Sequence, residues 1–241
     1  MPELDIRPSA SRDDDVRRIE AVERVLAGES PPEVLGYPLG RRHLAVVAWG
    51  RNPPESVKLL AWELSSELLS VQVEQDTVWG WLALSNGVER ELHRWLRGFT
   101  PPAGGVALGA TGAGPNGFRE SHMQALAAER VARISGAAVT FYADVALEAL
   151  ALHDIDAARH FVRHVLGDLL EENLRARELR ATLRAYFAAG QQALSAAAML
   201  GVHERTVGHR LRAVETRLGD RPVASARAEL ELALRLHELL S

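Results

Sequence analysis

Polar and basic side chains recur on one side of a predicted helix near the carboxyl end of this 241-residue chain. Arg205, His209 and Arg212 are spaced by three or four residues, so they share one helical face. Glu204 and Thr206 lie beside them in the first turns. Side chains of these types bind base edges and phosphate oxygens when a helix enters the major groove of DNA. The segment therefore predicts a nucleic-acid-binding face.

The opposite side of the same segment is apolar. Its residues recur at the spacing of a single buried stripe, namely Val207, Leu211, Val214 and Leu218. Before it, we expect Ser195 to cap a short alanine-rich helix and Gly201 to form a tight turn in the left-handed backbone conformation. Two helices joined in this way are typical of a helix-turn-helix motif.

Two residues of this segment allow more than one role. Arg210 and His203 either brace the motif or touch the DNA backbone, while Gly208 lets the helix backbone lie close to DNA. The predicted DNA-binding residues are Ser195, His203, Glu204, Arg205, Thr206, His209, Arg210 and Arg212. The alternative is an ordinary helical hairpin with solvated arginines, and the chain would then be a non-catalytic ligand-sensing or protein-interaction module.

Charge is distributed unevenly along the chain. Residues 177–241 hold 10 arginines and 7 acidic residues, whereas the remainder holds 18 basic and 25 acidic residues. This asymmetry allows local contact with DNA although the formal net charge is −4. The absence of cysteine excludes disulfides and thiolate sites. Since we find neither a leader nor an apolar stretch of membrane-spanning length, we expect a cytoplasmic protein with no membrane partner.

Hydrophobic periodicity divides the chain into an α/β part and an all-α part. We expect strands at 43–49, 71–73, 77–84, 106–108 and 138–142, and helices at 13–26, 55–70, 88–96 and 118–134. From residue 145 onward only helices are expected, at about 145–153, 155–166, 171–189, 194–200, 204–218 and 225–240. The pattern predicts a mixed sheet covered by helices, followed by an all-α helix-turn-helix domain.

The carboxyl-terminal segments resemble those of the PucR/CdaR group of bacterial transcriptional regulators. The resemblance rests on Leu183 to Phe187, Ala196 to Leu200, Val202-His203, Thr206-Val207, Arg210-Leu211, Glu215 to Gly219 and Leu230 to Leu240. Many relatives have Arg-Asn before the threonine and tyrosine before the arginine, where this chain has Glu204-Arg205 and His209. These departures lie on the reading face, so they bear on the preferred DNA sequence.

Upstream segments extend the resemblance to about residues 33–240. Residues Leu35 to Leu39, and Gly117 to His122 with Ala125 and Ala128, resemble parts of the degenerate GGDEF-like domain that such regulators often carry. The resemblance implies a cyclase-like, ferredoxin-like α+β or α/β domain at 33–150, after a lead-in and helix at 1–32. A helical connector at 151–176 and a helix-turn-helix domain at 177–241 would follow. The usual sensor domain would precede these parts, so we expect a short family member or a trimmed chain.

Other chemistry is less well supported by the residues. A GGDEF-type cyclase needs a glycine-rich acidic turn, but the hairpin turn reads Glu74-Gln75-Asp76, so we expect no catalytic residues. Gly112 to Gly117 matches a dinucleotide fingerprint only weakly and is better interpreted as a flexible loop. His160 and His164, with Asp168 one turn on, lack a further assignable ligand, so neither metal nor cofactor is expected.

Two partners besides double-stranded DNA are expected. One short recognition helix buries little surface, which favours a homodimer that places two such helices in successive major grooves. A helix beginning at Phe118 would put Arg119, Ser121 and His122 near its positive end, where an anionic small-molecule effector is able to bind.

Overall fold

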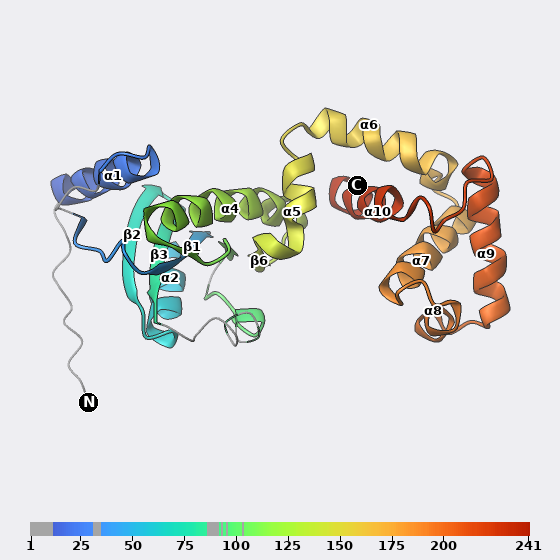
Figure 1. Cartoon of the computed structure of the whole chain (residues 1–241), viewed down its shortest axis with the longest axis horizontal. Coiled ribbons are helices and arrows are strands. Elements are labelled where there is room, and N and C mark those ends of the chain that lie inside the picture. The colour runs from blue at the N-terminus through green and yellow to red at the C-terminus, as the bar shows by residue number, and fades with distance from the viewer. Residues whose placement is uncertain (1–11, 31–34, 86–91, 93, 95, 103) are drawn as a thin grey trace. The chain divides into compact units, whose positions relative to one another are not determined.

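The computed structural model describes residues 12–30, 35–85, 92, 94, 96–102 and 104–241. The chain forms two compact units, Met1–Ala149 and Leu150–Ser241, which we call the sheet unit and the helical unit (Figure 1). In the part of the chain that is described, no helix has the length and apolar character needed to cross a membrane.

Six strands form one mixed sheet within the described part of the sheet unit. They are β1 (Arg42–Trp49), β2 (Glu67–Glu74), β3 (Thr77–Leu84), β4 (Gly105–Leu108), β5 (Gly112–Ala113) and β6 (Val139–Phe141). The order is β2-β3-β1-β4-β6, with β5 pairing beside β4 on β1. Only β4 and β6 pair in parallel. The sequence around Val46 is apolar at consecutive positions because this central strand is covered on both faces.

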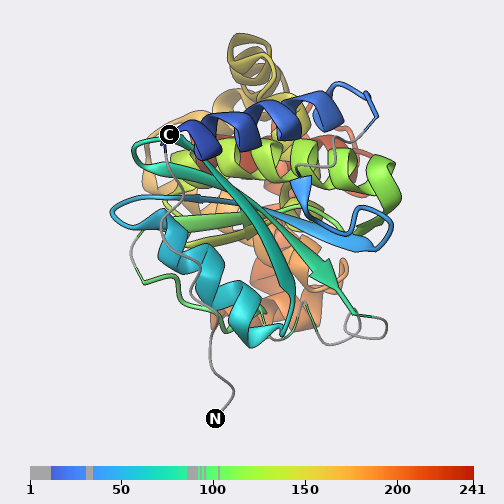
Figure 2. The same cartoon turned by 90° about the vertical axis from the view of Figure 1, so that its left-hand side faces the viewer.

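Helices cover both faces of the sheet. Helices α1 (Arg12–Leu26) and α4 (Gly114–Ser135) lie on one face, and α2 (Pro53–Glu63) lies on the other (Figure 2). Trp81 packs between the sheet and α4, where its ring stacks on Phe118 at a centroid distance of 4.4 Å. On the α2 face, Leu60 packs against Val46 and its neighbours. The predicted mixed sheet covered by helices is confirmed.

Some predicted boundaries in the sheet unit are wrong. The helix predicted at 55–70 ends at Glu63, and β2 begins at Glu67 after a turn in which Ser65 has a φ of 46°. The segment predicted as a flexible loop at 112–117 instead forms β5 and the first turn of α4, because Pro115 fits an opening helical turn. The helix predicted at 88–96 falls largely outside the described residues.

The helical unit is built from packed helices around a main core cluster and a smaller second one. Helix α5 (Tyr142–Ala151) runs across the boundary between the units, and α6 (Ile155–Leu166) and a 3₁₀ turn, η2 (Gly167–Leu170), follow it. The remaining helices are α7 (Leu174–Ala188), α8 (Ala193–Leu200), α9 (Glu204–Arg217) and α10 (Arg227–Leu240). Val162 and Leu166 of α6 belong to the same core cluster as Leu230 and Leu234 of α10. Residues of the predicted connector therefore share a core with the predicted helix-turn-helix domain.

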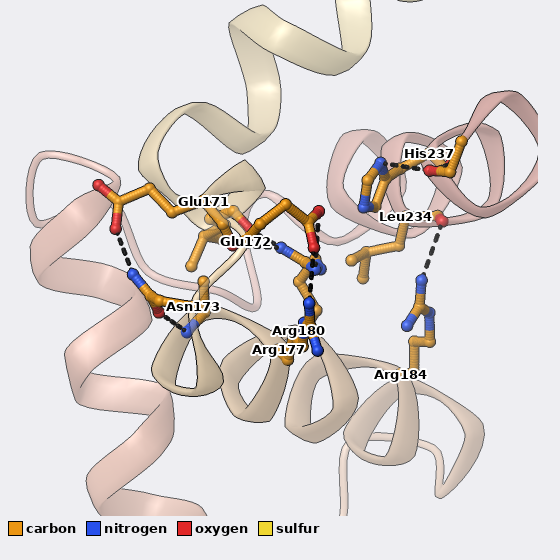
Figure 3. A network of polar contacts seen from close by, with 11 residues as sticks. Glu171, Glu172, Asn173, Arg177, Arg180, Arg184, Leu234 and His237 are labelled. Carbon is orange, nitrogen blue, oxygen red and sulfur yellow. Dashed lines mark hydrogen bonds and ion pairs between the residues drawn. The ribbon is translucent and has the colours of Figure 1, made fainter.

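A network of polar contacts joins the start of α7 to its neighbours (Figure 3). The Arg180 side chain is buried and donates hydrogen bonds to the carbonyl oxygens of Leu169 and Glu171. Asn173 caps α7, since its Oδ1 accepts from the Ala176 backbone N–H at 2.7 Å. Arg184 donates to the Leu234 carbonyl oxygen of α10 at 3.5 Å. These contacts fix η2, α7 and α10 relative to one another.

Candidate nucleic-acid interface

The predicted tight turn between α8 and α9 is present. Gly201 ends α8 with a φ of 65°, a left-handed conformation that glycine adopts without steric cost. His203 then caps α9, because its Nδ1 accepts the backbone N–H of Arg205 at 3.1 Å. The expectation that Ser195 caps α8 is wrong, since Gln192 occupies the cap position. Ser195 lies inside the helix, with its Oγ 3.2 Å from the Gln192 Oε1.

The apolar stripe of α9 faces the protein as predicted. Val207 and Val214 are fully buried, and Leu211 and Leu218 are partly buried. Val207 packs against Ala196 and Ala197 of α8 and against Ala185 of α7. The small alanine side chains let the helices approach closely at this point. Packing of this stripe fixes which face of α9 remains outside.

The outward face of α9 is polar and open. Arg205, His209 and Arg212 are exposed, as is Glu204, and Thr206 is half-buried. The structure therefore gathers these five predicted residues on one side of the helix. Gly208 lies in the same stretch, and a β-carbon built there would meet nothing within 4 Å. This part of α9 leaves its backbone accessible to a large partner.

Arg210 differs from the other arginines of α9. Its side chain is only 14% exposed, and its Nη2 lies 2.8 Å from the Glu178 Oε1 of α7. Its Nη1 donates to the Thr182 Oγ1 of α7 at 3.5 Å. Of the two roles considered for Arg210, this geometry matches bracing of the motif. The His203 side chain is exposed and also holds the start of α9, so it combines a cap with access to the surface.

A depression of about 350 Å³ opens beside the first turns of α9. Its lining residues are Arg175, His203, Arg205, Thr206, His209 and Arg210. Sequence reasoning missed Arg175, which comes from the first turn of α7, some way before the helix-turn-helix motif in the chain. The Arg175 Nη1 lies 3.4 Å from the Glu178 Oε2, so Glu178 contacts both Arg175 and Arg210. The depression therefore has a predominantly cationic lining that is partly balanced by one carboxylate.

The three residues proposed to bind an effector differ in burial and in their contacts. The Ser121 Oγ is buried and accepts the Ala45 backbone N–H of β1 at 2.8 Å. Arg119 donates from Nη1 to the Val25 carbonyl oxygen of α1 at 3.4 Å. His122 is buried, and burial lowers its imidazole pKa to about 4. Ser121 and His122 thus belong to the interior of the sheet unit.

Comparison with known proteins identifies two regions of the chain. Residues 33–131 match the GGDEF-like domain, and residues 179–236 match the PucR C-terminal helix-turn-helix domain. The chain belongs to the PucR family. The PucR-type match spans the α8-turn-α9 motif and most of α7 and α10, whereas the GGDEF-like match spans the sheet from β1 to β5 and most of α4. This PucR-family chain is a DNA-binding transcriptional regulator.

One solved structure was also compared with this PucR-family chain. A crystal structure of a regulator of polyketide synthase expression from Bifidobacterium adolescentis is 17% identical in sequence and aligns with a TM-score of 0.41. The alignment covers 92% of this chain and 97% of that chain. Curated proteins gave no match to the chain.

Proposed function

We propose that this PucR-family regulator binds specific double-stranded DNA sequences as a homodimer, with α9 of each subunit in a major groove. The observation that carries the proposal is the division of α9 into two faces. Val207 and Val214 are buried, while Arg205, His209 and Arg212 remain exposed along the opposite face. A helix arranged in this way is held by its own subunit and still has donors free for DNA.

The contacts of each side chain suggest distinct roles. Arg205, Thr206 and His209 lie on the first turns of α9, the part of a recognition helix that approaches base edges. We assign Arg175 and Arg212 to phosphate contacts, since both flank that segment. Arg210 positions α9 through Glu178. His203 and Glu204 complete the proposed interface after the turn, and Ser195 completes it from the first turn of α8.

Dimerisation is supported by the small size of the motif. One short helix and its turn bury too little DNA surface for high specificity, whereas two copies read two half-sites. We expect sedimentation of the full chain to show a dimer bound to a duplex with two half-sites about one helical turn apart. A single subunit on such a duplex, at concentrations that saturate it, would contradict the homodimer.

The sheet unit is proposed to regulate the DNA-binding part without catalysis. The turn between β2 and β3 consists of Gln75 and Asp76, which offers no glycine-lined site for a triphosphate and its metal. We expect no cyclic dinucleotide when the full chain is incubated with GTP and Mg²⁺.

An anionic effector that binds near Arg119 remains part of this proposal. An anion that stabilises the chain in a thermal-shift screen, but does not stabilise Arg119→Ala, would support it. The proposed site of action is the cytoplasm, where the DNA lies.

The decisive experiment is selection of bound duplexes from random DNA, followed by affinity measurements with variants. If Arg205 reads a base edge, Arg205→Ala should cost about 1–3 kcal/mol and relax the preference at one base pair. If Arg175 contacts a phosphate, Arg175→Ala should weaken all sequences alike and reduce the salt slope by about one.

Arg159→Ala is a matched control, because Arg159 is an exposed arginine of α6 away from this face. It should leave both the affinity and the salt slope unchanged. Failure of the folded chain to bind any duplex at low salt would contradict the proposal. Equal losses for Arg205→Ala and Arg159→Ala would contradict the assignment of the reading face.

A further inference from the structure

A second cavity lies in the helical unit, at the end of α9 opposite to the proposed reading residues. Its volume is about 420 Å³, and it is formed by α6, the end of α9 and the start of α10. Phe161, Leu218 and Leu230 give it an apolar lining. A concave space of this size that combines apolar side chains with a few polar groups is typical of sites for small organic molecules.

The rim of this cavity carries more positive than negative side chains. Arg217, Arg221 and His164 contribute donors, and Glu229 contributes a carboxylate. Glu229 is already compensated, because the Arg221 Nη2 lies 3.0 Å from each of its two carboxylate oxygens. The remaining arginine, Arg217, is therefore the cation left to bind an acid.

Arg217 is positioned to do so. Its Nη1 donates to the Ala213 carbonyl oxygen of its own helix at 3.1 Å, and within the described residues no carboxylate lies at ion-pair distance from it. A guanidinium has five N–H donors in a planar fork, so several remain for a ligand. This fork matches the two oxygens of a carboxylate.

We propose that the cavity between α6, α9 and α10 binds a small organic acid whose carboxylate pairs with Arg217 and whose apolar body packs against Phe161, Leu218 and Leu230. The ligand class follows from two complementary features, an apolar lining and an uncompensated arginine at the rim. A free inorganic anion would leave the apolar side chains uncovered, and a neutral apolar molecule would offer no carboxylate to Arg217.

Such a ligand would touch the helix that carries the DNA-binding residues. Arg217 and Leu218 end α9, and Arg205 lies in its first turn. Occupancy would change the surroundings of α9 at one end, and a ligand that favours one arrangement of α9 changes DNA affinity by the same factor as DNA changes ligand affinity. This coupling rests on the proposed function, whereas binding of the acid does not.

The test uses the full-length chain and titration calorimetry with octanoate, with 1-octanol as the uncharged control of equal chain length. Saturable binding of one octanoate per subunit is expected, with octanol at least about tenfold weaker because it lacks the charge-assisted bonds. Arg217→Ala should weaken octanoate about tenfold and leave octanol unchanged, and Arg217→Lys should fall between them. The exposed Arg159→Ala variant is the matched control and should bind like the original chain.

Several results would overturn the proposal. These are absence of saturable octanoate binding, octanol binding as tightly as octanoate, or an equal loss in Arg159→Ala and Arg217→Ala. If octanoate does not bind but Arg217→Ala changes the sedimentation coefficient, the surface is a contact between copies of the chain instead. If octanoate binds but leaves the affinity for duplex DNA unchanged, the coupling is refuted, and this result is distinct from failure of DNA binding itself.

Discussion

The two units bury nitrogen-containing side chains of different kinds. The sheet unit buries the imidazoles of His43 and His122, which are 0% and 2% exposed. The helical unit buries the guanidinium of Arg180, which is 6% exposed, and most of that of Arg210. An imidazole becomes neutral when it loses a proton, but a guanidinium stays charged throughout the accessible pH range. The sheet unit is therefore able to keep its buried imidazoles neutral, whereas the helical unit must supply hydrogen-bond acceptors for its buried guanidinium groups.

In the sheet unit the two imidazoles are both kept neutral by burial, yet their partners differ. His43 accepts at Nδ1 from the Tyr37 hydroxyl and donates from Nε2 to the Leu39 carbonyl oxygen, each at 3.0 Å. Burial lowers the His43 pKa, and the bond to Leu39 opposes this shift. Neither ring nitrogen of His122 has a hydrogen-bond partner in the described residues, and the ring lies 4.5 Å from Trp79 between ring centroids. Protonation of His122 is therefore the more costly of the two.

In the helical unit the buried charges are matched by fixed acceptors. Arg180 binds two backbone carbonyl oxygens, and Arg210 binds the carboxylate of Glu178. These contacts do not depend on loss of a proton by the arginine. The comparison teaches that the fully buried imidazoles belong to the sheet unit, whereas the helical unit holds its buried guanidinium groups by fixed acceptors. In the helical unit, burial and the nearby Arg180 and Arg184 also lower the pKa of the part-buried His237.

The largest expected effect is that of Arg180→Ala on the helical unit. We expect a loss of about 3–4 kcal/mol in the free energy of unfolding, because the buried Leu169 carbonyl oxygen and the part-buried bond to Glu171 lose their donor and the arginine stem leaves a cavity. Denaturant unfolding followed by far-ultraviolet circular dichroism measures this loss. All five tryptophans lie in the sheet unit, so their fluorescence transition should not shift.

Arg177→Ala is the matched control for Arg180→Ala. Arg177 is also on α7, but it is exposed and pairs with Glu172 at the surface. Its replacement should change the unfolding free energy by less than about 0.5 kcal/mol. Similar losses for the two variants would remove the distinction between buried and exposed arginines.

Acid should act first on the sheet unit through His122. Its pKa is about 4 when folded and 6.5 when unfolded, so only the unfolded state takes up a proton between these values. Stability is therefore complete above about pH 6.5 and falls as the pH drops to 4, by at most about 3 kcal/mol. Tryptophan fluorescence measures the free energy of unfolding of the original chain and of His122→Phe. Between pH 6.5 and 4, the original chain should lose stability relative to the variant. Parallel curves for the two proteins would refute this assignment.

Removal of the carboxylate that holds Arg210 should have an intermediate effect. Glu178→Gln is expected to lower the stability of the helical unit by about 1–2 kcal/mol, because a mostly buried arginine loses its charged partner. It also removes a negative charge beside Arg175, so non-specific binding to duplex DNA at low salt should become tighter. Circular dichroism and DNA titration measure the two effects, which have opposite signs. A loss of DNA affinity in the folded variant would assign Glu178 a different role.

The smallest expected change in stability is a gain. Gly208→Ala should stabilise α9 by about 0.5–1 kcal/mol, since the added methyl group meets no protein atom and alanine favours helix. If the α9 backbone lies against DNA, the same methyl group should weaken DNA binding. Thermal unfolding and DNA affinity measured on one preparation separate these effects. Unchanged DNA affinity would place the backbone at Gly208 away from the duplex.

Much of the fold was predictable because its periodicity reflects burial. The stripe from Val207 to Leu218 and the apolar strand around Val46 both correspond to buried surfaces. The predicted helix at 55–70 was too long because Leu64 and Leu68 continue the helical spacing, yet they pack on the same core from a turn and from β2. Spacing alone does not reveal that Ser65 reverses the backbone between them.

The residues of the candidate site were predictable from the sequence only where they lie together on one helix. The exposed face with Arg205 and His209 follows from the helical repeat of α9. The partner of Arg210 does not, because Glu178 lies on another helix and is brought close only by packing of α7 on α9. Arg175 was missed for the same reason. Nothing in the sequence near Ser195 showed that α8 begins after Gln192.

The bond between Arg210 and Glu178 limits how the reading helix is able to respond to a signal. Together with the packing of Val207 against α7 and α8, it ties three helices into one block. Tilting α9 alone would break a charged contact and open a packed core at once. A ligand bound at the end of α9 is therefore expected to shift α7, α8 and α9 together rather than to tilt α9 alone.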